Sequence, residues 1–158
     1  MTGLRFAQRV RHFLQRDRFV RLWFVPAWLG LGIAGLAIAL LAFKRIAPRL
    51  GTHNGTSIPA LDVLPHHEAR ALQICRTIQL AERYAPWRAD CYPQAIIARL
   101  LLGLYRVPFI LCLGLRRDGE TGKLSAHAWV RCGQVAVTGG VGEADHRIVS
   151  VFVRASCA

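Results

Sequence analysis

The sequence predicts an α+β domain preceded by an apolar, arginine-rich helical segment. Two stretches with apolar residues at helical spacing come first, and beyond residues 107–108 the chain changes to short apolar stretches of strand character. Helices followed by a run of strands are typical of α+β domains, in which neighbouring strands pair as an antiparallel sheet. With 158 residues, the chain is long enough for one domain of ordinary size.

Residues 1–50 form an N-terminal segment that differs in composition from the remainder. It holds eight Arg and one Lys against a single acid, Asp17. Within it, residues 22–43 carry no charge, and a helix of that length can cross a bilayer core of about 30 Å. Basic residues lie on both sides of the stretch and give no orientation. We therefore expect a helical segment that associates with a membrane, by spanning it or by docking on it.

The alternative for this segment is a helical hairpin packed on the protein. Proline and glycine interrupt helices, and the uncharged stretch contains four of them, Pro26, Gly30, Gly32 and Gly35. The residues before Arg21 place Phe6, Val10, Phe13 and Leu14 on one helical side among arginines. Such an amphipathic pattern suits an anionic lipid surface.

The net charge of +12 indicates an anionic partner such as a lipid surface or an acidic peptide. Nucleic acid is not favoured, because the basic residues are dispersed and the chain has neither zinc-finger spacing nor an aromatic–basic motif. The five cysteines are an odd number without a CxxC pair, which disfavours a disulfide framework and a metal site. Reduced thiols are typical of a cytoplasmic protein.

Residues 51–59 are polar, contain glycine and end in proline, as linkers do. We therefore expect one compact domain over residues 60–158. Apolar residues at helical spacing predict its first helix over residues 65–85. A second helix begins at Asp90, a residue type that caps helices, with Pro93 in the first turn, where proline is tolerated. Strands in an antiparallel meander are predicted at residues 109–115, 125–132, 135–138 and 147–154.

Cys91 is the candidate nucleophile because it directly follows the predicted cap of the second helix. Amides at a helix N-terminus stabilise a thiolate and lower the pKa of the thiol. The same amides, including that of Cys91, could line an oxyanion hole. A carboxylate beside the sulfur would raise the pKa, so we expect Asp90 to turn back and cap the helix.

His127 is the candidate general base because it lies inside a predicted strand, between two alanines that leave room for another element. Trp129 lies two residues on, on the same face of the strand, and could shield the imidazole. The alternative is a structural core histidine whose ring nitrogens are hydrogen-bonded to the backbone. The other histidines lie outside the core domain, at a helix start or in a polar loop: His12, His53, His66, His67 and His146. The other cysteines are expected to be core or terminal thiols: Cys75, Cys112, Cys132 and Cys157.

The two candidates sit in longer motifs, DCYPQAIIARLLLGLYRVPFILCLGL at residues 90–115 and AHAWVRCGQVAVTGG at residues 126–140. Together these motifs resemble the leader peptidases of lasso-peptide biosynthesis, which are transglutaminase-like, papain-related cysteine hydrolases. The resemblance covers residues 65–153. It implies Cys91 as the nucleophile and His127 as general base and acid. The implied reaction removes the leader from a ribosomally made precursor through a thioester.

The chain departs from this family at a third catalytic position. The family commonly has an Asp about a dozen residues after the histidine, where it orients the imidazole. Thr138, Gly139 and Gly140 occupy that place here. The sequence leaves four candidates for the orienting role, namely Glu143, Asp145, the Thr138 hydroxyl and a backbone carbonyl.

The resemblance implies three partners, the precursor peptide, a separate leader-binding protein and a macrolactam-forming synthetase. No cofactor is expected, since GGVG at residues 139–142 lacks the Lys and Ser/Thr of a phosphate-binding loop. Two other functions stay open. One is a transglutaminase-like amidase or acyltransferase acting on another peptide, and the other is a non-enzymatic, membrane-associated scaffold. The expected location is the cytoplasm, at the inner face of the cytoplasmic membrane for a docked form.

Overall fold

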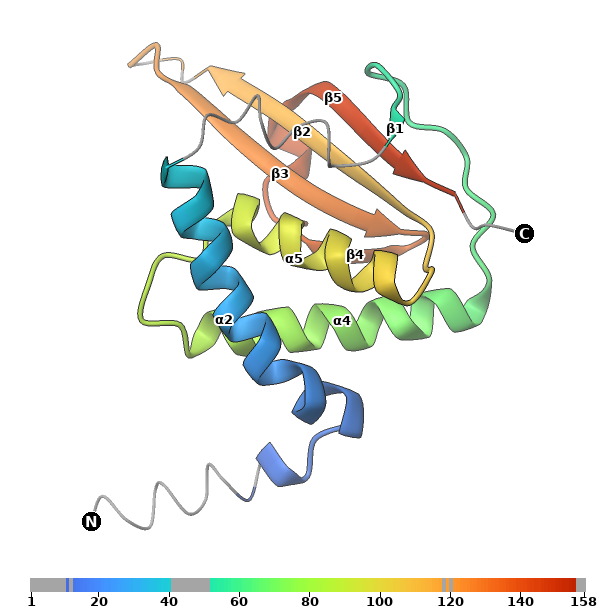
Figure 1. The fold of residues 1–158 in the computed structure, drawn as a ribbon. Helices are drawn as coiled ribbons and strands as arrows, with labels where there is room; N and C mark the ends of the chain where they lie inside the picture. Colours follow the sequence, from blue (N-terminus) through green and yellow to red (C-terminus); the bar gives the residue numbers. More distant parts are fainter. Residues whose placement is uncertain (1–10, 12, 41–51, 118, 120, 156–158) are drawn as a thin grey trace.

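The described residues of the computed structural model are 11, 13–40, 52–117, 119 and 121–155. Within them, two helices pack against one face of a five-stranded antiparallel sheet, and a further helix lies on those two (Figure 1). The helices are α2 (Arg18–Leu40), α4 (Pro65–Arg83) and α5 (Cys91–Leu104). The strands are β1 (Thr52–His53), β2 (Phe109–Arg117), β3 (Leu124–Cys132), β4 (Val135–Thr138) and β5 (Arg147–Arg154). This architecture confirms the predicted α+β fold and its order of helices before strands.

The strand order β1-β5-β2-β3-β4 corrects the predicted meander. Strands β2, β3 and β4 are consecutive neighbours, but β5 returns to the far side of β2 and pairs with it along most of its length. The returning chain passes over Gly114, where an added Cβ would lie 2.8 Å from both His146 Cβ and the Trp129 ring. The absence of a side chain at Gly114 therefore allows this crossing, which local strand patterns do not reveal.

Part of the predicted linker, residues 51–59, belongs to the sheet. Strand β1 pairs with β5, and the contact continues beyond it. The Asn54 amide donates to the Val151 carbonyl, and the Val151 amide donates to the Gly55 carbonyl, both at 2.8 Å. This stretch therefore covers an edge of the sheet on its way to α4.

The main core lies between the sheet and the helices. Ala98 and Leu102 of α5 are fully buried against the sheet, and Ile74 and Ile78 of α4 are fully buried beside them. Alternate strand residues close this core from the sheet side, among them Leu111, Ala128, Val130, Val137 and Phe152. A smaller cluster of Cys112, Trp129 and Val151 lies apart from it. Because side chains alternate along a strand, His127 and Trp129 share the face opposite Ala128.

Helix α2 runs unbroken through Pro26 and the three glycines, so the predicted break of a hairpin is wrong within residues 18–40. Two of the glycines permit close packing instead. An added Cβ at Gly30 would lie 2.7 Å from Ile97 Cδ1, and one at Gly32 would lie 2.9 Å from the Trp87 ring. Glycine here brings the helix backbone close to its neighbours.

One face of α2 is docked on α4 and α5 (Figure 1). Its buried side chains are Phe19, Val20, Ala27, Leu31 and Ala34. Two indole groups fix the helix at its sides, since Trp23 Nε1 donates to Tyr105 Oη at 2.7 Å and Trp28 Nε1 donates to the Tyr84 carbonyl at 3.0 Å. Among the described helices, α2 has the length and composition needed to cross a membrane, a property that core helices and signal sequences share.

Candidate active site

Cys91 is the first residue of α5, at the end of the loop that follows α4. Asp90 occupies the N-cap position, as predicted, but its side chain makes no capping hydrogen bond. The carboxylate instead pairs with the Arg88 guanidinium at 3.5 Å, on the exposed side of the loop. The expectation that Asp90 turns back onto the helix is therefore wrong, because a neighbouring cation holds it elsewhere.

The thiol of Cys91 faces strand β3. It accepts hydrogen bonds from the amides of Ala128, Tyr92 and Cys91 itself. The amide of Ala128 is available because the pairing of β4 with β3 ends at Val130↔Thr138. The early end of β4 thus opens a notch at the edge of the sheet, where the N-terminus of α5 meets β3.

Burial raises the pKa of the Cys91 thiol above its ordinary value, and the nearby Asp90 carboxylate raises it further. The amides of Ala128 and Tyr92 oppose this rise but do not overcome it. The sequence predicts the reverse, because it reveals the helix terminus but not the desolvation. At neutral pH the sulfur is therefore mostly protonated, and nucleophilic attack needs a base to remove its proton.

His127 approaches the notch from the other face of β3 and is half-buried. Its Nε2 lies 2.8 Å from the backbone carbonyl oxygen of Gly139. A carbonyl oxygen only accepts hydrogen bonds, so the neutral ring carries its proton on Nε2 and a free lone pair on Nδ1. The ring is thus held in the tautomer in which Nδ1 can act as a base.

The carbonyl of Gly139 lies twelve residues after His127, at the place where the resemblance leads one to expect an Asp. Gly139 adopts φ +69°, and an added Cβ would overlap the Ala128 carbonyl oxygen and lie 2.9 Å from Trp129 Cα. No carboxylate side chain fits at this position without moving the backbone. The dipole of the Gly139 carbonyl therefore takes the place of the charged side chain that the resemblance leads one to expect beside the imidazole.

The other three candidates for the orienting role are engaged elsewhere or turned away. Glu143 pairs with Arg131 at 3.1 Å, and Asp145 pairs with Arg116 at 3.7 Å. The Thr138 hydroxyl is buried and finds no hydrogen-bond partner in the described part of the chain. Of the four candidates, the structure brings the backbone carbonyl to the ring.

Two aromatic rings flank the imidazole of His127. Trp129 stacks on it with 5.8 Å between ring centroids, which agrees with the expected shared face. His146 lies on it at 5.0 Å, although the sequence places this residue in a polar loop. The Nδ1 atom of His146 lies 2.7 Å from the Gly142 carbonyl oxygen. Only the return of the chain over β2 brings this second histidine to the site, so no local pattern could identify it.

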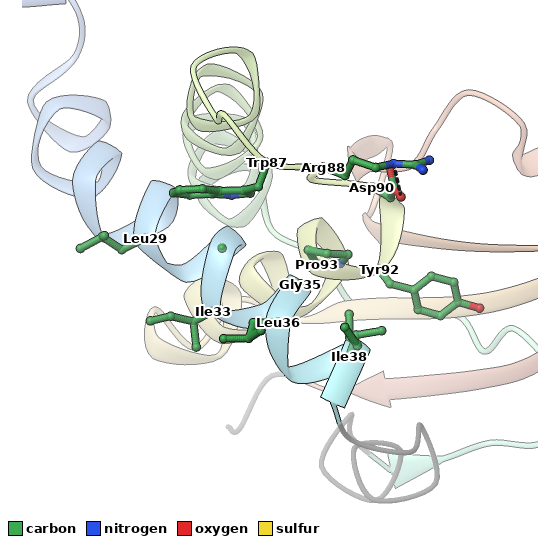
Figure 2. A pocket seen from close by; sticks show the side chains of 12 residues that line it. Leu29, Ile33, Gly35, Leu36, Ile38, Trp87, Arg88, Asp90, Tyr92 and Pro93 are labelled. Atoms are coloured by element: carbon green, nitrogen blue, oxygen red, sulfur yellow. Dashed lines mark ion pairs between the residues drawn. The ribbon is translucent and has the colours of Figure 1, made fainter.

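Cys91 and His127 line one cleft of about 560 Å³, together with Gln94 and the chain from Ala136 to Val141. A second hollow of about 660 Å³ lies on the other side of the first turn of α5. Figure 2 shows its apolar wall, with Ile33 and Leu36 of α2 near Trp87 and Pro93. Asp90 lines both spaces, so Cys91 sits beside an apolar hollow built partly by α2.

The other described cysteines are buried, as predicted. Burial raises the pKa of Cys112 and of Cys132 to about 11, and burial also raises the pKa of Cys75. Cys157 lies outside the described residues. In the part of the chain that is described, Cys91 is thus the thiol with access to solvent. No group of three or more His, Cys, Asp or Glu in the same part of the chain could hold a metal ion.

A family model described as the transglutaminase-like superfamily matches residues 37–152. This match spans the end of α2, both helices of the core and the sheet up to β5. Comparisons with curated proteins and with solved structures give no significant match.

Proposed function

The chain belongs to the transglutaminase-like superfamily, and we propose that within it this protein is a cysteine peptidase that removes the leader from a lasso-peptide precursor. Members of the superfamily are generally enzymes of the cysteine-protease type. The observation that carries the proposal is the shared cleft of Cys91 and His127, in which the imidazole is held with Nδ1 as the free base.

The proposed reaction begins when Nδ1 of His127 takes the proton from the Cys91 thiol. The sulfur then attacks the scissile carbonyl carbon, and the carbonyl oxygen becomes an oxyanion near the Cys91 amide. As the C–N bond breaks, the imidazolium returns its proton to the leaving amine. Water then attacks the thioester with His127 again as base, which releases the new carboxylate and restores the thiol.

The Gly139 carbonyl sets the character of this base. A carboxylate would stabilise the imidazolium by a full charge, whereas a carbonyl contributes a dipole alone. The raised pKa of Cys91 works in the same direction, because burial disfavours the thiolate. We infer that the thiol form of Cys91 predominates at rest, and that His127 must take its proton for the thiolate to form.

The substrate assignment rests on the sequence motifs around the two residues and on the form of the site. The cleft is open and about 560 Å³ in volume, which leaves space for an extended peptide. The proposal includes a separate leader-binding protein, which would present the precursor to the cleft, and a macrolactam-forming synthetase that would take the product. We place the reaction in the cytoplasm.

The test is incubation of the purified protein with a candidate lasso-precursor peptide and a candidate leader-binding protein, chosen from genes in the neighbourhood of its own, followed by mass spectrometry. We expect wild type and Cys75→Ala to release the leader, and Cys91→Ala to leave the precursor intact. Cys75 is the matched control because it is a buried cysteine on α4 that does not itself line the cleft; its thiol lies behind the lining, 3.6 Å from the Ala136 carbonyl. An intact precursor with the wild-type protein would refute the substrate, and cleavage by Cys91→Ala would refute the nucleophile.

An amidase or acyltransferase acting on another peptide would use the same thioester. It differs in the acceptor, since an amine rather than water would attack the acyl group. Adding a primary amine to the cleavage reaction distinguishes the two. A peptidase gives the free acid as the main product, and an acyltransferase gives the amide.

The raised pKa of Cys91 and the missing carboxylate favour a second candidate, a non-enzymatic scaffold. In a scaffold, the two residues would be structural, and His127→Ala would leave the reactivity of Cys91 with iodoacetamide unchanged. In the peptidase, His127 helps to form the thiolate, so the same change slows alkylation.

A further inference from the structure

The outward face of α2 is apolar along its whole length. Six large side chains recur at intervals of three or four residues, so they share one side of the helix. Their exposed fractions are 69% for Leu22, 54% for Val25, 49% for Leu29, 68% for Ile33, 61% for Leu36 and 73% for Leu40. Contiguous apolar surface of this extent is uncommon on a soluble monomer and indicates an interaction site.

Helix α5 extends this apolar surface. Leu100 and Leu104 are 52% and 61% exposed, and they follow Ile97 at intervals of three and four residues. Ile97 contacts α2 at Gly30, so the two leucines lie on the side of α5 that α2 occupies. The six α2 side chains with Leu100 and Leu104 are called the α2 face below.

The inward side of α2 is held on the domain and would be lost if the helix left it. Leu31 is fully buried there, and the indoles of Trp23 and Trp28 are bonded to Tyr105 and Tyr84. Crossing a bilayer as a single helix would break both hydrogen bonds and expose the core beneath. A bilayer can therefore meet the α2 face with the helix axis in the plane of the membrane, while the domain stays folded.

An exposed positive charge lies at the N-terminal end of this face. Arg18 precedes Leu22 by one turn on the same side of α2 and is exposed. At the other end, the backbone carbonyl of Arg88 lies 3.7 Å from the Cβ position of Gly35, and the Arg88 guanidinium pairs with Asp90. With a net charge of +12, the chain is complementary to anionic headgroups around an inserted apolar strip.

We propose that the α2 face is a docking surface for a bilayer containing anionic lipids, on which α2 lies parallel to the membrane. Docking would bring the hollow beside Cys91 to the level of the headgroups, because Leu29, Ile33 and Leu36 belong to both. The proposal does not depend on the peptidase assignment, since binding requires no chemistry at Cys91.

The test is co-sedimentation of the full-length protein with vesicles of phosphatidylcholine, with and without an equal amount of phosphatidylglycerol. We expect binding to the mixed vesicles and weaker binding when phosphatidylglycerol is absent or salt is high. The triple variant Leu22→Gln, Ile33→Gln and Leu40→Gln should bind the mixed vesicles more than about a hundredfold more weakly. Glutamine has nearly the same helix propensity as leucine.

The matched control replaces three exposed apolar side chains elsewhere, Ile58→Gln, Leu124→Gln and Val149→Gln, whose exposed fractions are 54%, 67% and 45%. It should bind as the wild type does. Circular dichroism of all three proteins establishes that each is folded. Equal binding of both triple variants would overturn the proposal. So would a wild type that binds no vesicle and instead forms a dimer that the α2 variant loses. Bound protein should be released by alkaline carbonate, and resistance to it would indicate a spanning helix.

Discussion

The imidazole of His127 hydrogen-bonds through Nε2 to the backbone carbonyl of Gly139, at 2.8 Å. This single contact fixes the ring tautomer and leaves Nδ1 as the available base in the cleft. A backbone group cannot be removed by mutation, but its position can be changed through the conformation of its own residue.

Replacing Gly139 with alanine should disturb this contact. The added Cβ would overlap the Ala128 carbonyl, and alanine would have to adopt φ +69°, a conformation that residues other than glycine rarely adopt. The carbonyl of residue 139 must therefore move away from the imidazole ring. We expect kcat for precursor cleavage to fall by on the order of tenfold to a thousandfold. Steady-state cleavage assays on folded protein measure this change.

The matched control for this change is Gly122→Ala. Gly122 has φ +66° but nothing lies within 4 Å of its added Cβ, so it reproduces the backbone strain away from the site. Both variants should lose about 1 kcal/mol of stability from strain, and Gly139→Ala should lose activity in addition. Equal activity of the two variants would show that the carbonyl does not orient the ring.

Changing Asp90 to asparagine should increase the reactivity of Cys91. The pKa of this thiol is raised by burial and secondly by the Asp90 carboxylate, so removing the charge lowers the pKa and enlarges the thiolate fraction at pH 7. The rate of alkylation by iodoacetamide should rise about threefold, and its pH profile should shift towards lower pH.

Asp62→Asn is the control for this effect, because Asp62 is an exposed carboxylate that does not contribute to the pKa of Cys91. Peptide-resolved mass spectrometry measures the label at position 91 separately from the other thiols, of which Cys112 and Cys132 are buried and have pKa values of about 11. A faster reaction in the Asp62→Asn protein would mean that net charge, and not the position of Asp90, controls the thiol.

Replacing Thr138 with valine should stabilise the protein without loss of activity. The hydroxyl is buried and has no hydrogen-bond partner among the described residues, and valine has nearly the same shape. Removing an unsatisfied buried hydroxyl should raise the free energy of unfolding by about 1 kcal/mol. Urea denaturation measures the gain. A loss of cleavage by folded Thr138→Val would instead assign the orienting role to the hydroxyl.

Two alanine substitutions in α2 should have opposite effects on stability. Gly35 has room for a methyl group, with its nearest neighbours at 3.7 and 3.9 Å, whereas a Cβ at Gly32 would lie 2.9 Å from the rigid Trp87 ring. Gly35→Ala should stabilise the helix by about 0.5–1 kcal/mol. Gly32→Ala should destabilise it by about 1–3 kcal/mol through overpacking.

Thermal unfolding of the two variants tests how α2 is held. Trp87 also packs on Trp28 of α2, with 4.5 Å between their ring centroids. Displacing the Trp87 ring would therefore weaken two contacts of α2, the one at Gly32 and the one at Trp28. If Gly32→Ala is as stable as wild type, the helix can move away from the loop that carries Trp87 and is less firmly docked than the structure indicates.

Local patterns did not predict β1 or the short 3-10 helix Glu143–Asp145, but they predicted α4, α5 and the strands β2 to β5, because periodicity and turn residues act over short distances. The position of Cys91 at the start of α5 and that of His127 inside β3 belong to this class. The features that local patterns did not predict depend on contacts between residues that are distant in the chain. The return of β5 beside β2 and the arrival of His146 at His127 both require the crossing over Gly114.

The electrostatics of the site were also beyond prediction from the sequence. The helix terminus at Cys91 was predicted, but not the burial that raises the pKa of the thiol. Asp90 was predicted to be a cap, but Arg88 holds its carboxylate away from the helix. The orienting carbonyl of Gly139 has no side chain and therefore no sequence signature.

The burial of Cys91 has a consequence for the protein under oxidative conditions. Peroxides attack thiolates, and enzymes with a permanently ionised active-site cysteine are converted to sulfenic and then sulfinic acids. A buried cysteine whose thiol stays mostly protonated reacts slowly with such oxidants. The burial that lowers the nucleophilicity of the resting sulfur therefore also protects it from oxidation.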